Sequence, residues 1–195
     1  MAGGNLVERA ARGDRAALER LWLAERRRVA AVLLAHRPRE EDLEDLLQEV
    51  GTILVERIGE LRDPSRFSSW LRTIAVNVAR TSGRRAKILR DRRRALDGAN
   101  EPTDPAASPP AHLEQQENLR QVLRWIQGMS PDVAEPLLMR SVWGLSQRQI
   151  AEWLGLPETT VETRLARARR ALREQIEASD RLRRAEGSLP CSKRW

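Results

Sequence analysis

Residues 159–168 combine short polar side chains with arginines at helical spacing, and their chemistry suits hydrogen bonding to nucleic acid. Threonines come first and arginines follow: Thr159, Thr160, Thr163, Arg164 and Arg167. Hydroxyl groups can pair with the edges of bases, while a guanidinium group binds guanine edges in bidentate fashion or neutralises phosphates. Apolar residues occupy intervening positions of the same helical repeat: Val161, Leu165 and Ala168. The stretch predicts a helix that reads DNA, with a solvated basic face as the alternative.

The segment before this helix has the spacing of a helix-turn-helix. Ser146 and Gln149 match a capping box, which predicts that a short helix begins at the residue after the serine. Ala151 would let the two helices approach, Gly155 would form the turn, and Val161 would pack back on the first helix. In this interpretation, a β-carbon at Gly155 would push the two helices apart.

A different row of polar side chains runs along a predicted helix over residues 40–58. It contains acids, an amide and a hydroxyl at helical spacing: Asp45, Gln48, Glu49, Thr52 and Glu56. An apolar stripe beside it would face the core: Leu43, Leu46, Leu47, Val50, Ile53, Leu54 and Ile58. Carboxylates are repelled by DNA phosphates and attracted to basic proteins. The row indicates a docking face for a protein partner, and a solvated helix face is the alternative.

The composition favours a nucleic-acid partner and argues against metal chemistry. The chain has 195 residues and a formal net charge of +7. Only Lys87 and Lys193 are lysines among the 35 basic residues, although a GC-rich genome also enriches arginine. With one cysteine and two histidines, we expect no intramolecular disulfide, no metal site and no cofactor. No apolar run reaches the length of a signal peptide or a membrane span, so we expect a cytoplasmic protein without a membrane partner.

Apolar residues recur at helical spacing along almost the whole chain, which predicts an all-α fold of two small helical domains joined by a flexible linker. The predicted helices cover residues 5–36 with a break at Gly13 and Asp14, then 40–58, 64–94, 112–127, 131–143 and the helix-turn-helix from 147. Residues 95–111 contain four prolines and mark the linker. The predicted domains are residues 1–94 and 112–175, followed by an extension over residues 176–195.

The extension allows two interpretations. The arginines of residues 181–184 could continue the last helix to Gly187, but a disordered end is favoured. Trp195 could dock on one of the domains. Cys191 could sense oxidation, although a lone thiol is more often incidental.

Three stretches, in order along the chain, resemble two regions of the sigma-70 family of transcription initiation factors. "DLLQEV" at residues 45–50 and "FSSWLRTIAVNVAR" at residues 67–80 resemble its region 2. "GLSQRQIAEWLGLPETTVETRLARARRAL" at residues 144–172 resembles its region 4. Because no domain lies between them, the chain looks like the small extracytoplasmic-function, or group IV, type. The resemblance implies a factor without a catalytic site that binds core RNA polymerase and directs initiation by reading the −35 and −10 promoter elements.

The resemblance also implies roles for individual residues. Asp45, Gln48 and Glu49 match positions that grip the clamp helices of the largest polymerase subunit, and region 4 would dock on the polymerase flap. The loop of residues 59–66 and the helix after it match the part that captures the −10 element as a single strand with one base flipped out. The residues that bind this strand would be Arg62, Arg66, Asn77, Arg80, Arg84 and Arg85. The −35 element would be contacted by Thr160, Glu162, Thr163, Arg164 and Arg167.

Basic residues farther along the strand-binding helix, and Trp70 near its beginning, lie close to the predicted −10 contacts in sequence. Further phosphate contacts could come from the basic end of the strand-binding helix: Lys87, Arg90, Arg92, Arg93 and Arg94. A frayed and solvated helix end is the alternative for them. Trp70 is expected in the core beside Phe67 and Leu71 rather than stacked on a base.

Two positions depart from the common family pattern. Glu162 stands where a basic residue is frequent, and Ala166 stands where a histidine is frequent. A carboxylate facing the major groove would disfavour phosphate and could accept a hydrogen bond from a cytosine amino group. We therefore assign no familiar −35 sequence, and the short loop of residues 59–66 leaves the identity of the flipped base open.

Two other functions fit parts of the sequence. A stand-alone helix-turn-helix regulator would bind duplex DNA without polymerase, but it leaves "DLLQEV" unexplained. A nuclease or recombinase would need a carboxylate cluster or a nucleophile, and Asp45 and Glu49 have no partner motif elsewhere. An anti-sigma protein is a further candidate partner.

Overall fold

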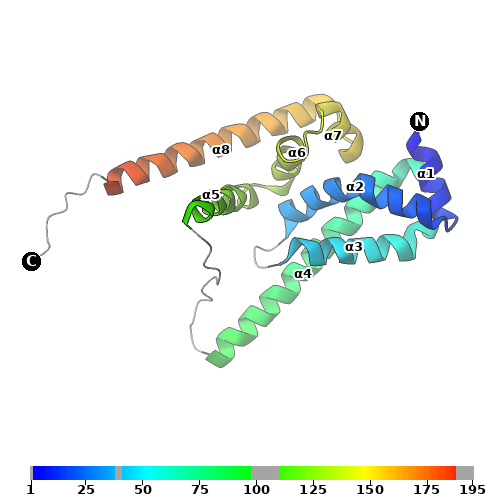
Figure 1. The fold of residues 1–195 in the computed structure, drawn as a ribbon, viewed down its shortest axis with the longest axis horizontal. Helices are drawn as coiled ribbons and strands as arrows, with labels where there is room; N and C mark the ends of the chain where they lie inside the picture. Colours follow the sequence, from blue (N-terminus) through cyan, green and yellow to red (C-terminus); the bar gives the residue numbers. More distant parts are fainter. Residues whose placement is uncertain (1, 38–40, 98–109, 188–195) are drawn as a thin grey trace, which may run out of the picture.

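The computed structural model describes residues 2–37, 41–97 and 110–187, and every regular element in those ranges is a helix (Figure 1). The predicted all-α fold is confirmed. The helices form an N-terminal domain, made of α1 to α4, and a C-terminal domain, made of α5 to α8.

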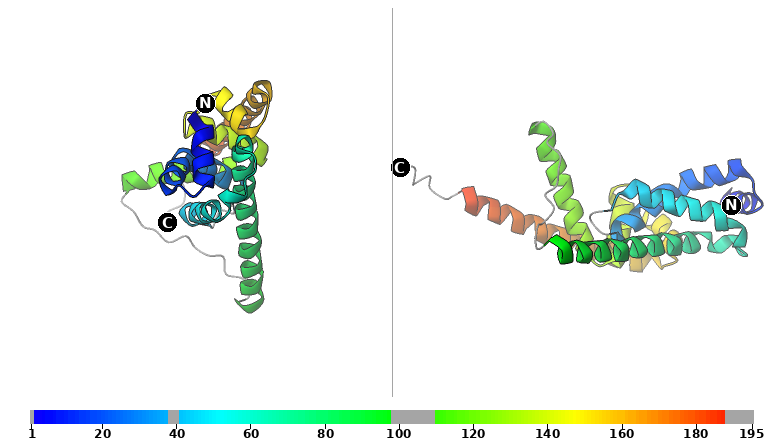
Figure 2. Two further views of the ribbon diagram at one scale, coloured as in Figure 1. Left: turned by 90° about the vertical axis from the view of Figure 1, so that its right-hand side faces the viewer. Right: turned by 90° about the horizontal axis from the view of Figure 1, so that it is seen from below.

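The N-terminal domain contains four α-helices and two short 3-10 helices. Their bounds are α1 (Ala2–Ala11), α2 (Arg15–His36), α3 (Leu43–Arg57), η1 (Ile58–Glu60), η2 (Pro64–Arg66) and α4 (Phe67–Asp97). The helices α2, α3 and α4 pack against one another. The end of α4 extends beyond the other helices of this domain (Figure 2).

The C-terminal domain contains the helix-turn-helix. Its helices are α5 (Pro110–Gln127), α6 (Pro131–Ser141), α7 (Gln147–Leu154) and α8 (Glu158–Gly187). The helix α7 begins where the capping box predicts. Ser146 Oγ accepts a hydrogen bond from the Gln149 N–H at 3.2 Å, and Gln149 Oε1 accepts one from the Ser146 N–H at 2.9 Å. Both α6 and α7 pack on α8.

The break between α1 and α2 follows from two adjacent residues. Gly13 has a φ of +92°, a left-handed conformation that a β-carbon disfavours. Asp14 then caps α2, because its Oδ1 accepts a hydrogen bond from the Ala17 N–H at 3.0 Å. That bond, together with the pairing of Arg9 to Oδ2 at 2.6 Å, holds the pKa of Asp14 below its ordinary value.

The apolar stripes that the sequence predicts form the core of the N-terminal domain. The buried residues of α3, η1 and α4 include Leu46, Leu47, Val50, Leu54, Ile58, Phe67, Leu71, Ile74 and Val78. Trp70 packs against this core, and its ring centroid lies 6.1 Å from that of Phe67. The expectation that Trp70 is a core residue is therefore supported.

One stretch of α2 is buried on every face. None of its seven residues is more than 9% exposed: Val29, Ala30, Ala31, Val32, Leu33, Leu34 and Ala35. A helix covered on one side only carries polar residues on its other face. This stretch has none, because α2 contacts α3 and α4 of its own domain and also α6 of the C-terminal domain. The two domains therefore share α2 as a common packing surface.

Both ends of the predicted linker differ from the structure. The predicted linker of residues 95–111 overlaps two helices, since α4 continues to Asp97 and α5 begins at Pro110. Proline suits the first turn of a helix, where its missing N–H would have no partner. Residues 98–109 lie outside the described residues.

The expectation of a disordered end is wrong for residues 176–187, because α8 continues to Gly187. Residues 173–186 contain no glycine or proline and are rich in strong helix formers. Arg170 and Glu174 also pair across one turn at 4.0 Å. The suggestions for Cys191 and Trp195 lie outside the described residues.

Gly155 forms the turn of the helix-turn-helix for a reason that differs from the prediction. A β-carbon at this position would meet nothing within 4 Å, so the expected steric separation of the helices is wrong. The backbone instead adopts a φ of +65°, and the Leu156 N–H donates to the Ala151 carbonyl at 3.0 Å. The requirement for glycine is therefore conformational.

We expect Gly155→Ala to lower the free energy of unfolding by about 1–2 kcal/mol, because the left-handed region costs an L-residue roughly that amount. Urea denaturation followed by circular dichroism would measure it. Gly51→Ala is the matched control. A β-carbon at Gly51, inside α3, would touch the Trp22 ring at 3.5 Å in ordinary contact, and alanine favours the helix. Equal losses in the two variants would contradict the conformational explanation.

Candidate nucleic-acid and polymerase interfaces

The second helix of the helix-turn-helix, α8, presents the predicted DNA-reading residues to solvent. Glu162, Thr163 and Arg167 are exposed, whereas Thr160 and Arg164 are half-buried. The opposite face is fully buried and consists of Val161, Leu165 and Ala168. The helix is thus anchored by its apolar side, and its polar side remains available to a duplex.

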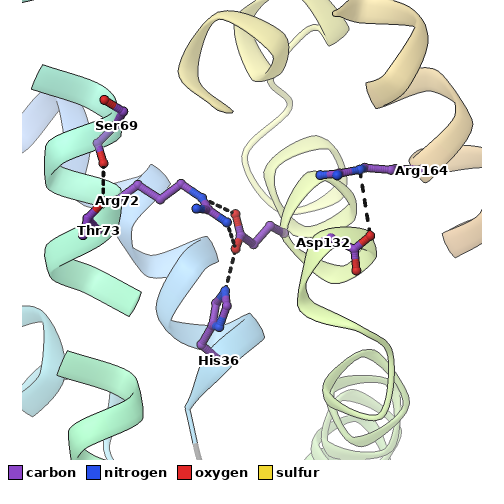
Figure 3. A network of polar contacts seen from close by, with 7 residues as sticks. His36, Ser69, Arg72, Thr73, Asp132 and Arg164 are labelled. Atoms are coloured by element: carbon purple, nitrogen blue, oxygen red, sulfur yellow. Dashed lines mark hydrogen bonds and ion pairs between the residues drawn. The ribbon is translucent and has the colours of Figure 1, made fainter. Parts of the chain in front are cut away.

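Two of these side chains are already engaged within the protein. The Thr163 Oγ1 donates a hydrogen bond to the Thr159 carbonyl at 2.9 Å, so this hydroxyl offers its lone pairs rather than its proton to a base. Arg164 Nε lies 3.9 Å from Asp132 Oδ2 of α6 (Figure 3). Sequence reasoning missed Asp132, because nothing in the local pattern shows that the first turn of α6 faces α8.

The polar row of α3 lies on the outside of the N-terminal domain. Asp45 and Gln48 are exposed and Glu49 is half-buried, while the apolar stripe of the same helix is in the core. The acids near the beginning of the helix are favoured by its dipole. Asp42 supports this end, since its Oδ1 accepts a hydrogen bond from the Glu44 N–H at 2.7 Å. The row is therefore an acidic surface on a rigid element.

The predicted strand-binding residues are all exposed. They are Arg62, Arg66, Asn77, Arg80, Arg84 and Arg85. The last four lie on α4, and the first two come from the η1–η2 segment just before it. Beyond them Lys87, Arg90 and Arg92 are also exposed, whereas the side chains of Arg93 and Arg94 lie outside the described residues. These side chains are thus accessible to solvent along α4 and the segment before it.

Asp63 shapes this loop, and sequence reasoning did not identify it. Its Oδ1 accepts hydrogen bonds from the Ser65 hydroxyl at 2.6 Å and from the Ser65 N–H at 2.9 Å. These bonds to the charged form hold the pKa of Asp63 below its ordinary value. An aspartate two residues before a serine, next to a proline, is a turn signal that could have been read.

Among the described residues, no three histidine, cysteine, aspartate or glutamate side chains are grouped so that they could hold a metal ion. Within the same ranges, no helix is both long enough and apolar enough to cross a membrane.

Comparisons with known proteins agree on one family. Residues 21–88 match the family described as "Sigma-70 region 2", and residues 119–172 match "Sigma-70, region 4". The chain is 31% identical to the ECF RNA polymerase sigma-E factor of Escherichia coli K12 over 180 residues, which span 88% of this chain and 93% of that protein. The sigma-E factor of Salmonella typhimurium LT2 shows the same identity and coverage.

A longer relative and a solved structure extend the comparison. The probable RNA polymerase sigma factor RfaY of Xanthomonas campestris is 32% identical over 173 residues, which span 86% of this chain and 42% of that protein. The fold is similar to that in "Structure of CnrH in complex with the cytosolic domain of CnrY", with a TM-score of 0.59 and 23% identity. That similarity covers 91% of this chain and 99% of the other, and it shows the fold.

The two family matches lie in both domains and in the order that the two motifs predict. A stand-alone helix-turn-helix regulator would account for the C-terminal domain only, and is therefore not favoured. The chain belongs to the sigma-70 family and is an RNA polymerase sigma factor of the extracytoplasmic-function type.

Proposed function

We propose that this factor docks on core polymerase through α3, captures the −10 element on α4 and reads the −35 element with α8. It supplies no catalytic group, since bond formation belongs to the polymerase, and it acts in the cytoplasm where polymerase and DNA meet. The single observation that carries the proposal is the separation of charge on the N-terminal domain. An acidic row on α3 and a basic surface on α4 are both exposed, on two helices that pack against each other.

The acidic row suits a protein partner better than DNA. Asp45 and Glu49 lie one turn apart, with Gln48 beside them as a neutral hydrogen-bonding group. Opposite charge on a partner speeds association and selects orientation, whereas phosphate would be repelled. We assign these three residues to the clamp helices of polymerase, and the C-terminal domain to the flap.

The basic surface of α4 suits single-stranded DNA. Its arginines can neutralise phosphates and release counterions, while Asn77 can pair with a base edge. Removing one base from the stack costs a few kcal/mol, which contacts in the loop of residues 59–66 would have to offset. The hydrogen bonds of Asp63 keep this loop in one conformation, so less entropy is lost when the strand binds.

Regulation by an anti-sigma protein is part of the proposal. The similar structure contains CnrH in complex with the cytosolic domain of CnrY, and this complex supports a protein regulator for the present chain. The overall similarity to CnrH supports the proposal that this chain takes a regulator of the same kind.

Run-off transcription with core polymerase on a genomic library tests the central proposal and identifies the promoters.

Gln48→Ala combined with Glu49→Ala should lower affinity for core polymerase about tenfold, equivalent to about 1.4 kcal/mol, because two groups of the docking face are lost. Fluorescence titration with core would measure it. Glu19→Ala, an exposed acid on α2, is the control and should bind normally. Unchanged affinity of the double variant would remove α3 from the interface.

Replacing Arg84 and Arg85 with alanine should reduce the salt dependence of binding to single-stranded promoter DNA. Each lost phosphate contact on a single strand lowers the slope of log affinity against log salt by about 0.7. The measurement is holoenzyme binding to a pre-melted promoter, chosen from the run-off library, over a series of salt concentrations. Arg20→Ala, an exposed arginine on α2, should leave the slope unchanged. The same slope for all three proteins would contradict a role for α4 in phosphate binding.

Glu162 should govern one position of the −35 element. An exposed carboxylate can accept a hydrogen bond from a cytosine amino group, and a good base contact contributes about 1–3 kcal/mol of discrimination. Glu162→Gln should therefore weaken the preference at a single base pair roughly tenfold or more. Selection from a promoter pool randomised in the −35 element would reveal it. Glu174→Gln, farther along α8 and also exposed, is the control, and an unaltered profile for Glu162→Gln would exclude it from readout.

A further inference from the structure

The two domains are joined by a buried carboxylate. Glu135 of α6 is only 1% exposed, although it is charged. Arg72 of α4 donates to it twice, from Nε to Oε2 at 2.9 Å and from Nη2 to Oε1 at 2.7 Å. His36 Nε2, at the end of α2, lies 2.6 Å from the same Oε1. Figure 3 shows Arg72 and His36 converging on this carboxylate from two helices of the N-terminal domain.

A second polar contact joins the helix-turn-helix to α2 of the N-terminal domain. Trp153 of α7 is 3% exposed, and its Nε1 donates a hydrogen bond to Glu25 Oε2 of α2 at 2.8 Å. The other oxygen of Glu25 accepts from Arg28 Nη1 at 2.7 Å. Thus both acids at the domain interface are buried, and each is paired with a donor from the opposite domain.

Such an interface is suited to opening. A buried ion pair must offset the loss of water around both charges, and those charges regain their hydration when the domains separate. The apolar residues 29–35 of α2 also contribute to this interface, and separation of the domains exposes part of them, so opening has a cost that a partner must offset. The contacts of Glu135 therefore specify one closed arrangement without making it permanent.

The closed arrangement keeps the two proposed DNA-reading surfaces close together, and this step rests on the proposed function. Asn77 lies five residues after Arg72 on α4, and Asp132 lies three residues before Glu135 on α6. Asp132 in turn contacts Arg164 at 3.9 Å. Adding the helical rise and the reach of these side chains, Asn77 and Arg164 are at most about 40 Å apart.

A promoter places its two elements farther apart than this. The −35 and −10 elements are centred roughly 25 base pairs apart, which is about 85 Å along duplex DNA. One closed molecule cannot place α8 on the first element and α4 on the second.

We propose that the contacts of Glu135 with Arg72 and His36, assisted by Trp153 and Glu25, form a latch that closes the free factor. The factor reads a complete promoter only after Glu135 has left both partners. Because only the open fraction is competent, the latch lowers the apparent affinity for polymerase and promoter by that fraction. In the free protein, the surfaces of α2 and α4 that meet α6 are thus covered by the C-terminal domain of the same chain.

Charge reversal at the latch tests the proposal. Arg72→Glu places two carboxylates together and should open the chain, whereas Arg72→Glu with Glu135→Arg restores an opposite-charge pair and should close it again. Arg20→Glu, an exposed position on α2, carries the same change of charge and is the control. Circular dichroism would verify that each variant is folded. Trp153→Phe offers a milder second opening variant, because it keeps an aromatic side chain but removes the indole N–H donor.

Distance and activity are measured separately. Spin labels on Glu19→Cys and Arg169→Cys, in a Cys191→Ser background, report the separation of the domains by pulsed electron resonance without polymerase or DNA. We expect a short, narrow distribution for the native latch and the charge swap, and a longer, broader one for Arg72→Glu. At limiting core polymerase, Arg72→Glu should raise run-off transcription about fivefold or more, and saturating polymerase should abolish the difference.

The results separate the latch from the proposed function. Native distances in Arg72→Glu, or failure of the charge swap to shorten them, would overturn the latch. An open Arg72→Glu chain with unchanged transcription at limiting polymerase would overturn its restraining role. If the native chain directed no transcription at all, the proposed function would fail, and the distances would still decide whether the latch exists.

Discussion

The structure depends on one buried carboxylate that cannot be satisfied within its own domain. Glu135 is on α6, but its hydrogen bonds come from α2 and α4. A charge this deeply buried is tolerated only when it is paired, so the position of α6 on the N-terminal domain is set by Arg72 and His36. The placement of α7 and α8 follows, because both pack against α6. The orientation of the DNA-reading helix is thus determined from outside its own domain.

Local sequence patterns predicted the helices and their inner faces well. The capping box at Ser146 places the beginning of α7, and the apolar stripe of α3 is the buried one. These features depend on residues within a few positions of one another, which is the range over which helical periodicity and capping act. Gly155 shows the limit of such reasoning, since the turn was predicted correctly but its cause was a backbone angle rather than a clash.

The contacts between domains could not be predicted in the same way. Glu135 and Arg72 are 63 positions apart, and Trp153 and Glu25 are 128 apart. A single sequence shows which face of a helix is apolar, but not which distant element covers it. One signal was available, because residues 29–35 of α2 are apolar on all sides and such a helix must be covered all round. The assignment of individual residues to polymerase or promoter stays a prediction.

The complete burial of residues 29–35 has a consequence for how this protein can evolve. This stretch packs among helices of both domains, so a substitution that suits one domain must also be tolerated by the other. The two DNA-reading units are therefore not independent modules. Exchange of the C-terminal domain between relatives would carry a new promoter preference onto an α2 surface shaped for another partner. Divergence of specificity in such a chain has to proceed through coordinated change on both sides of α2.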